Sequence, residues 1–420
     1  MGKEKFGLNA TWSMAVGGMV GGGIFSVLGV VIMMAGQWAW LSFILAGGIA
    51  LISAHSYNQL SLMYKKGGGA FLFLNEIGYK GTAASLSWIL ILGYILTLSV
   101  YAFTFGEYVA HIINFGAWLP RVLSVLVIVG LALVNLRGAG NAAKIEIITV
   151  WGKVLVLGAL AIFGICMWQP EQLTEGIETM SWHRAIVGAA TIFVAYEGFQ
   201  LLSYDYKDIK KPSKTLPRAT ISAVLAVMLI YVLVSLGATM LVGAETLVQK
   251  KEIALSVAGE KAFGIAGLII VTIAAAFSTG SAINATMFST ARLIESVANQ
   301  DDLPKKLSKE NKAMVPANAI WVVSAFAMLL AVIGSLEVLV DAASLIFLIT
   351  FGIVNVLAYK ESCRFKWVSV LGALGCGIAI VLSVIEQIKH NPIPLFVFVG
   401  LVVLAFVLRP FLLKQICKNR

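Results

Sequence analysis

Two ionisable residues, Lys153 and Glu197, lie inside long apolar stretches of the sequence. A charged side chain in a hydrophobic environment is costly unless it is paired or hydrated, so such residues are candidates for function. Glu197 stands next to Gly198 near the middle of its stretch, where a carboxyl group can bind a proton or a cationic group. A structural carboxyl that only hydrogen-bonds between helices is the alternative.

Lys153 stands near the start of its apolar stretch, about 9 Å along a helix. At that depth the side chain can extend to the membrane surface and keep its ammonium group in water. The alternative is a lysine that points inward. Burial then disfavours the charged form, and the amine can act as a proton carrier.

The first apolar stretch is rich in glycine, which occurs at Gly17, Gly18, Gly21, Gly22 and Gly23. Each glycine costs about 1 kcal/mol relative to alanine inside a helix. Close packing through small residues is one explanation. The other is a break in the helix that exposes backbone N–H and C=O groups to a buried ligand. Three consecutive glycines favour the break.

The composition indicates which class of protein must position these residues. Of the 420 residues, 59% are apolar and 12% are charged, whereas soluble domains carry about 25% charged residues. The net charge of +10 is spread over short clusters between apolar stretches, which argues against nucleic-acid binding. The four cysteines have neither metal-site nor disulfide spacing, and no metal, cofactor or catalytic constellation is expected.

A hydrocarbon core needs about 20 apolar residues per crossing helix. The sequence therefore predicts an all-α integral membrane protein with twelve transmembrane helices. The predicted spans are 12–35, 39–63, 82–113, 121–136, 145–168, 185–204, 217–242, 262–292, 317–335, 339–359, 366–387 and 392–413.

The distribution of basic residues predicts the orientation. Apart from Lys153, the segments assigned to the outside hold only Arg121, Arg184, Lys250, Lys251, Lys261 and Lys389 of the 31 lysines and arginines. Because basic residues concentrate on the cytoplasmic side, both termini are expected in the cytoplasm. The expected location of the chain is the plasma membrane.

The first and sixth spans are both interrupted, by Gly21–Gly23 and by Glu197–Gly198. Interrupted segments at corresponding positions of two halves indicate a midplane binding site in transporters built from inverted repeats. This pair is the strongest indication of function in the residues themselves.

The sequence resembles the amino acid–polyamine–organocation superfamily of permeases. Motifs typical of that family occur in order along most of the chain, at 21–25, 67–70, 135–138, 193–199, 211–219 and 298–304. Two positions depart from the family pattern: Lys211 replaces an asparagine, and Asp302 replaces a glycine. Both fall in expected cytoplasmic loops.

The resemblance implies one transmembrane transporter domain, 1–420, with inverted repeats at about 12–168 and 185–359. Helices 1 and 6 would be broken, and two additional helices would lie at about 366–413. It also implies the substrate site. The amide groups around the first break would hold a carboxylate, backbone carbonyls of both breaks would hold the α-ammonium group, and Phe193 would cover the substrate. The substrate-binding residues that the resemblance implies are Met19, Val20, Gly21, Gly22, Gly23, Phe193, Val194, Tyr196 and Glu197.

In proton-coupled members of that family a lysine occupies the place of Lys153, close to helix 8 hydroxyls such as Ser281. The expected function is amino acid import by proton-coupled symport with alternating access. Exchange or export of amino acids, a polyamine permease, and a binding receptor or channel are the alternatives. An enzyme is not expected, and the side chain of the substrate and the oligomeric state stay open.

Overall fold

The computed structural model describes residues 5–113, 115–138, 142–361 and 364–408. Those residues form helices, joined by loops with two isolated β-bridges, Phe6 to Ile209 and Glu310 to Pro316. Cys363, Cys417 and the last residues of the twelfth predicted span lie outside the described residues.

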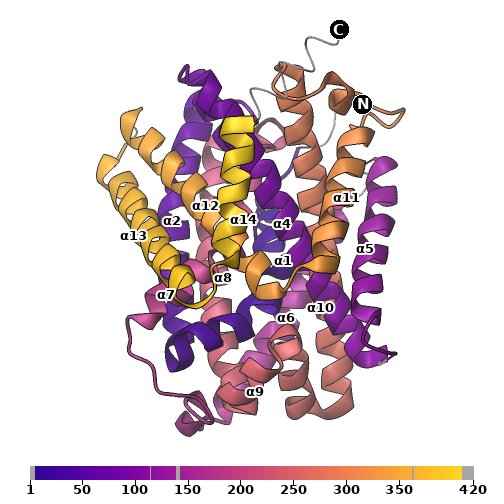
Figure 1. Cartoon of the computed structure of the whole chain (residues 1–420), viewed down its shortest axis with the longest axis vertical. Coiled ribbons are helices and arrows are strands. Elements are labelled where there is room, and N and C mark those ends of the chain that lie inside the picture. Colours follow the sequence, from indigo (N-terminus) through magenta and orange to yellow (C-terminus); the bar gives the residue numbers. More distant parts are fainter. Residues whose placement is uncertain (1–4, 114, 139–141, 362–363, 409–420) are drawn as a thin grey trace.

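Figure 1 shows the helices as a single bundle whose long axis is vertical. The α-helices are α1 (Leu8–Ala35), α2 (Ala39–Tyr64), α3 (Gly69–Glu76), α4 (Lys80–Ile113), α5 (Leu119–Leu136), α6 (Ala142–Cys166), α7 (Arg184–Thr191), α8 (Pro212–Val242), α9 (Ala244–Gln249), α10 (Ala254–Asn299), α11 (Ala317–Ile333), α12 (Leu336–Lys360), α13 (Lys366–His390) and α14 (Ile393–Val403).

The predicted membrane architecture is confirmed. Eight helical segments of the described chain are long and apolar enough to cross a membrane, and the first of them, Leu8–Tyr64, contains both α1 and α2. α11 and the segment Ile393–Val407 are shorter apolar helices. The count of twelve crossings stays a prediction.

α10 is longer than the predicted eighth span because it merges two helices. Phe263 and Gly264 have non-helical backbone angles inside it, and Gly264 has a φ of 62°. The predicted start of that span, residue 262, falls at this kink.

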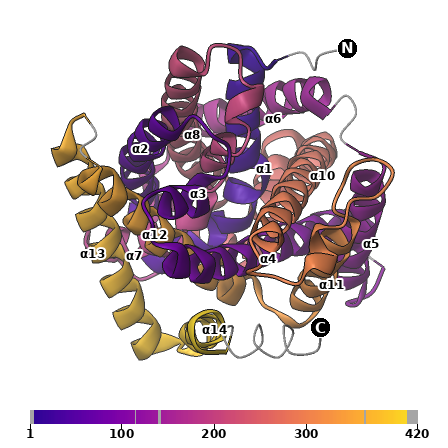
Figure 2. The same cartoon turned by 90° about the horizontal axis from the view of Figure 1, so that it is seen from above.

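The centre of the bundle is α1. It packs against α4, α6, α8 and α10, and Figure 2 shows it enclosed by them. Every residue from Ala15 to Ile32 is buried. A helix that is apolar on all sides and buried on all sides needs neighbours that come very close, which small residues permit.

The predicted break in the first helix is wrong for this structure. α1 is assigned as one uninterrupted helix from Leu8 to Ala35, and Gly21, Gly22 and Gly23 lie within it. The physical reason is packing: other parts of the bundle occupy the space where side chains would stand at these glycines.

The predicted break in the sixth span is confirmed. α7 ends at Thr191, and short 3₁₀ turns follow at Phe193–Tyr196 and Phe199–Ser203. Between them Glu197 is extended, and Gly198 has a φ of 135°. This backbone angle favours glycine, which has no Cβ.

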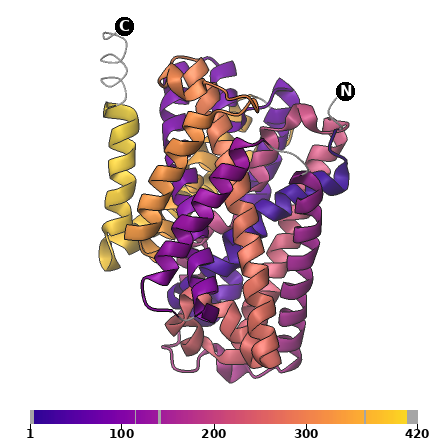
Figure 3. The ribbon, with the colours of Figure 1, turned by 90° about the vertical axis from the view of Figure 1, so that its right-hand side faces the viewer.

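Figure 3 shows the start of α1 and the end of α14 in the same upper part of the bundle. The segment before α1 is attached to the loop after the sixth span. The Phe6 N–H donates to the carbonyl of Asp208 at 2.8 Å, and the Lys210 N–H donates to the carbonyl of Phe6 at 2.8 Å. These bonds hold the start of α1 beside the interrupted part of the sixth span, 192–203, hereafter the broken segment.

Candidate functional site

The broken segment touches the glycine-rich part of α1 backbone to backbone. A Cβ atom built at Gly198 would lie 2.6 Å from the carbonyl carbon of Gly18 and 2.6 Å from the nitrogen of Met19. A Cβ built at Gly18 would lie 2.9 Å from the Cα of Gly198. Two glycines are therefore needed for this contact, and they bring together the two segments that the sequence singles out.

The other glycines of α1 face different neighbours. A Cβ at Gly21 would overlap the side chain of Ala282 on α10, and one at Gly22 would overlap the ring of Tyr101 on α4. A Cβ at Gly23 would meet the hydroxyl group of Tyr231 on α8. The glycines thus allow α4, α8 and α10 to pack closely against different sides of α1.

We expect Gly22→Ala to destabilise the protein by about 1–3 kcal/mol, the cost of overpacking a filled core. The added methyl group would displace the Tyr101 ring. Gly48→Ala is the matched control, since nothing lies within 4 Å of a Cβ at Gly48 and alanine is the better helix former. Thermal unfolding in detergent measures both. Equal unfolding temperatures for the two variants would contradict the packing explanation.

Side chains from three helices donate hydrogen bonds to carbonyl oxygens in the glycine-rich part of α1. Lys153 Nζ donates to Gly17 at 3.2 Å, Tyr231 Oη to Met19 at 2.7 Å and Ser278 Oγ to Val20 at 2.7 Å. Tyr231 Oη also lies 3.0 Å from the carbonyl of Ala195 in the broken segment, so its single proton is shared between the two carbonyls. The Met19 and Val20 carbonyls, both predicted ligands, therefore accept hydrogen bonds from the protein itself.

Glu197 is buried, with 1% of its surface exposed. Its carboxyl oxygens accept hydrogen bonds from Tyr101 Oη at 3.3 Å and from Gln200 Nε2 at 3.0 Å. No ion pair of the described residues includes Glu197. An uncompensated buried carboxylate is costly, so this environment favours a protonated carboxyl group or one that meets a cationic ligand.

Lys153 points inward. It is 3% exposed and reaches from α6 to the Gly17 carbonyl of α1, so the snorkelling interpretation is wrong. Ser281, predicted as its partner, is half-buried on α10, one turn beyond Ser278. On the same helix, the hydroxyl group of Ser278 donates to the Val20 carbonyl of α1.

Aromatic side chains surround the break. Phe193, the predicted cover of the site, packs edge-on against Phe351 of α12, with ring centroids 5.4 Å apart. The Tyr196 ring packs against Tyr231 at 5.4 Å, and its hydroxyl donates to the Phe43 carbonyl at 2.7 Å. These five aromatic side chains are buried.

α12 also holds the backbone of the break. Ser344 Oγ donates to the carbonyl of Thr191 at 2.5 Å and accepts a hydrogen bond from the N–H of Val194 at 3.0 Å. Ser344 therefore satisfies two backbone groups that the end of α7 frees. Val194, a predicted site residue, is held by this bond.

Two ion pairs tie loops and helices together beyond the site. Arg184 on α7 bonds to Glu386 on α13 at 2.7 Å. Lys251, in the turn after α9, pairs with Glu337 on α12. A Cβ at Gly29 of α1 would overlap Lys251, so this turn packs directly on α1.

Four side chains that donate hydrogen bonds around the break were not predicted from the sequence: Tyr101, Tyr231, Gln200 and Ser344. Buried tyrosine hydroxyls need a hydrogen-bond partner, so tyrosines inside apolar spans were the available signal. Their partners could not be known without the fold. Among the described residues no group of histidine, cysteine, aspartate or glutamate could hold a metal ion.

The chain is similar to known membrane transport proteins over most of its length. Residues 6–407 match the family model described as amino acid permease. The inner membrane transport protein YbaT of Escherichia coli is 27% identical over 86% of this chain and 84% of its own length. The serine/threonine exchanger SteT of Bacillus subtilis is 26% identical over 85% of this chain and 82% of its own.

Among solved structures, MhsT in complex with L-phenylalanine has a similar fold, with a TM-score of 0.65 at 15% identity. The match covers 91% of this chain and 100% of that one. The family model spans nearly the whole chain, and the predicted superfamily and fold are confirmed. The chain belongs to the amino acid permease family of the amino acid–polyamine–organocation superfamily, a family of transporters and not of enzymes.

Proposed function

We propose that the protein imports amino acids across the plasma membrane by proton-coupled symport with alternating access. The observation that carries the proposal is the buried Lys153 ammonium group on the Gly17 carbonyl of α1. A protonated lysine holds α6 to the same part of α1 that meets the broken segment. Loss of the proton weakens that bond, so the charge state of Lys153 favours one of two conformations.

The α-ammonium group of the substrate would bind at the carbonyls of Met19 and Val20, in place of the hydroxyl groups of Tyr231 and Ser278. Carbonyls of the broken segment, at Phe193, Val194 and Tyr196, would complete its shell. Binding of the carboxylate by the amides of Gly21, Gly22 and Gly23 requires α1 to open there, because a continuous helix uses these N–H groups internally.

The proposed orientation places both termini in the cytoplasm. Lysines and arginines are frequent before α1 and in the loop between the sixth span and α8, which supports it. The proposed inverted repeats are about 12–168 and 185–359, which place α1 and the broken segment at corresponding positions.

The test of the function uses purified protein in two steps. Thermal unfolding with each amino acid in turn identifies ligands, since a compound that binds only the folded state raises the unfolding temperature. Uptake of the best ligand into proteoliposomes is then measured with an imposed pH gradient. Saturable accumulation that follows the gradient supports symport. Binding without accumulation would point to a receptor or channel.

Amino acid exchange is the second candidate. It is supported by Glu197 in the broken segment and by the similarity to a protein named as a serine/threonine exchanger. Uptake that needs an amino acid inside the vesicles, and that a pH gradient alone does not drive, would favour exchange over symport.

We expect Glu197→Gln to remove a pH dependence of transport. Glutamine has the same shape but stays neutral, whereas the carboxyl group of the wild type is neutral at low pH and ionises as the pH rises. Variant and wild type should therefore transport alike at low pH and diverge at higher pH. Exchange rates measured from about pH 5 to 8 test this, across the range in which a buried carboxyl group can titrate. Parallel profiles would show that Glu197 does not sense protons.

A further inference from the structure

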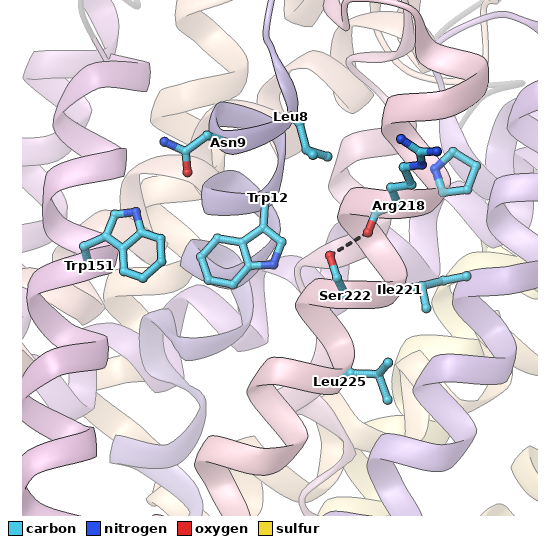
Figure 4. A pocket seen from close by; sticks show the side chains of 9 residues that line it. Leu8, Asn9, Trp12, Trp151, Arg218, Ile221, Ser222 and Leu225 are labelled. Carbon is cyan, nitrogen blue, oxygen red and sulfur yellow. Dashed lines mark hydrogen bonds between the residues drawn. The ribbon is translucent and has the colours of Figure 1, made fainter.

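A groove of about 670 Å³ opens on the side of the bundle next to the first turns of α1. α1, α6 and α8 form its walls, away from the glycine-rich segment. Figure 4 shows Trp12 and Trp151 on one side, and Arg218, Ile221 and Leu225 on the other. None of these residues belongs to the proposed substrate site.

The walls of the groove are mostly apolar. Trp12 of α1 and Trp151 of α6 stack with ring centroids 5.3 Å apart. On α8, Ile221 and Leu225 continue the surface away from Arg218. Trp151 is 46% exposed and Leu225 is 43% exposed, although both are apolar residues of membrane helices. An exposed apolar surface on membrane-spanning helices is expected to face lipid.

The apolar strip continues beyond the groove along both helices. Leu229 follows Leu225 by one turn of α8 and is 59% exposed. Leu155 follows Trp151 by one turn of α6 and is also exposed. α6 and α8 pack against each other, and each carries an exposed leucine one turn beyond the groove, which extends the apolar surface that an acyl chain requires.

One end of the groove is charged. Arg218 is the one charged residue among those that line it, and its exposed side chain lies on the α8 side of the groove, away from Asn9 and the two tryptophans (Figure 4). Within the described residues the Arg218 guanidinium group forms no ion pair or hydrogen bond; only its backbone carbonyl is engaged, by Ser222 at 2.6 Å. A free guanidinium group is well suited to a phosphate group.

The spacing fits one amphipathic ligand. Leu225 stands seven positions after Arg218 on α8, which is about 10 Å along a helix. Tryptophan rings prefer the boundary between lipid headgroups and hydrocarbon, and Trp12 and Trp151 both line the groove. The chain is also basic just before and at the start of α8, at Lys207, Lys210, Lys211 and Lys214.

We propose that the groove binds an anionic phospholipid, with its phosphate at Arg218 and one acyl chain between the tryptophan pair and the Ile221–Leu225 face of α8. In the proposed orientation the lipid belongs to the cytoplasmic leaflet. It would fill the space between α8 and the Trp12–Trp151 stack, and so hold the start of α1 against α6. Lys153, two residues after Trp151, binds α1 from the same helix.

Native mass spectrometry of the full chain tests the proposal, with phosphatidylglycerol or phosphatidylcholine added at equal concentrations. The wild type should retain phosphatidylglycerol in preference. Arg218→Gln should weaken retention of phosphatidylglycerol about fivefold, the effect of one basic residue near a lipid surface. Lys312→Gln, which removes an exposed lysine elsewhere, is the matched control and should retain the lipid like the wild type.

Leu225→Trp keeps the arginine and fills the groove, so it should reduce retention of both lipids. Retention of phosphatidylglycerol that neither Arg218→Gln nor Leu225→Trp changes would overturn the proposal. So would a dimer of the wild type that Leu225→Trp dissociates, because the groove would then be an interface between two copies. The assay needs no substrate, so a failure of the proposed transport function would not alter its result.

Discussion

Gly198→Ala should abolish transport and destabilise the protein by about 3 kcal/mol or more. Two costs combine in this variant. An alanine forced to a φ of 135° is strained by about 1–3 kcal/mol. Its Cβ would also lie 2.6 Å from backbone atoms of Gly18 and Met19, which cannot rotate away as a side chain can. Overpacking adds about 1–3 kcal/mol. α1 and the broken segment would then separate.

Two controls separate strain from overlap. Gly264 also has a positive φ, 62°, but nothing lies within 4 Å of a Cβ there, so Gly264→Ala measures strain alone. Gly48→Ala introduces neither backbone strain nor steric overlap. Unfolding temperatures should fall in the order Gly48→Ala, Gly264→Ala, Gly198→Ala, and uptake should be lost only in the last. If Gly198→Ala transports normally, contact between α1 and the broken segment is not needed for function.

Lys153→Ala should lose the response of uptake to a pH gradient. With one proton per substrate, a gradient of one pH unit supports accumulation of up to about tenfold, the ratio that one pH unit represents. Without the amine, the bond to the Gly17 carbonyl has no titratable donor. Substrate should then equilibrate across the membrane whatever the pH on either side. Proteoliposomes with an imposed gradient measure this accumulation ratio.

Lys153→Arg is the informative partner variant. Arginine can donate to the Gly17 carbonyl but is not deprotonated in proteins. It should therefore hold α1 against α6 and slow transport, whereas Lys153→Ala should leave flux down a gradient intact. Accumulation that still follows the pH gradient in Lys153→Ala would show that another group carries the proton, and Glu197→Gln then becomes the variant to compare.

The sequence alone indicated the membrane-spanning helices and the interrupted sixth span. Both are local properties: about 20 apolar residues cross a membrane whatever surrounds them, and Glu197–Gly198 disfavours a lipid-facing helix by itself. The permease motifs then identified the family, because their order and spacing are also read along the chain.

Only the tertiary structure decided what the glycines of α1 do and where Lys153 points. A glycine-rich segment is compatible with an open backbone or with close packing, and the choice depends on neighbours distant in sequence. Here Tyr101, Gly198, Tyr231 and Ala282 occupy the space around α1, so the helix stays continuous. Contact between residues far apart in the chain is a product of the whole fold, and no local pattern encodes it.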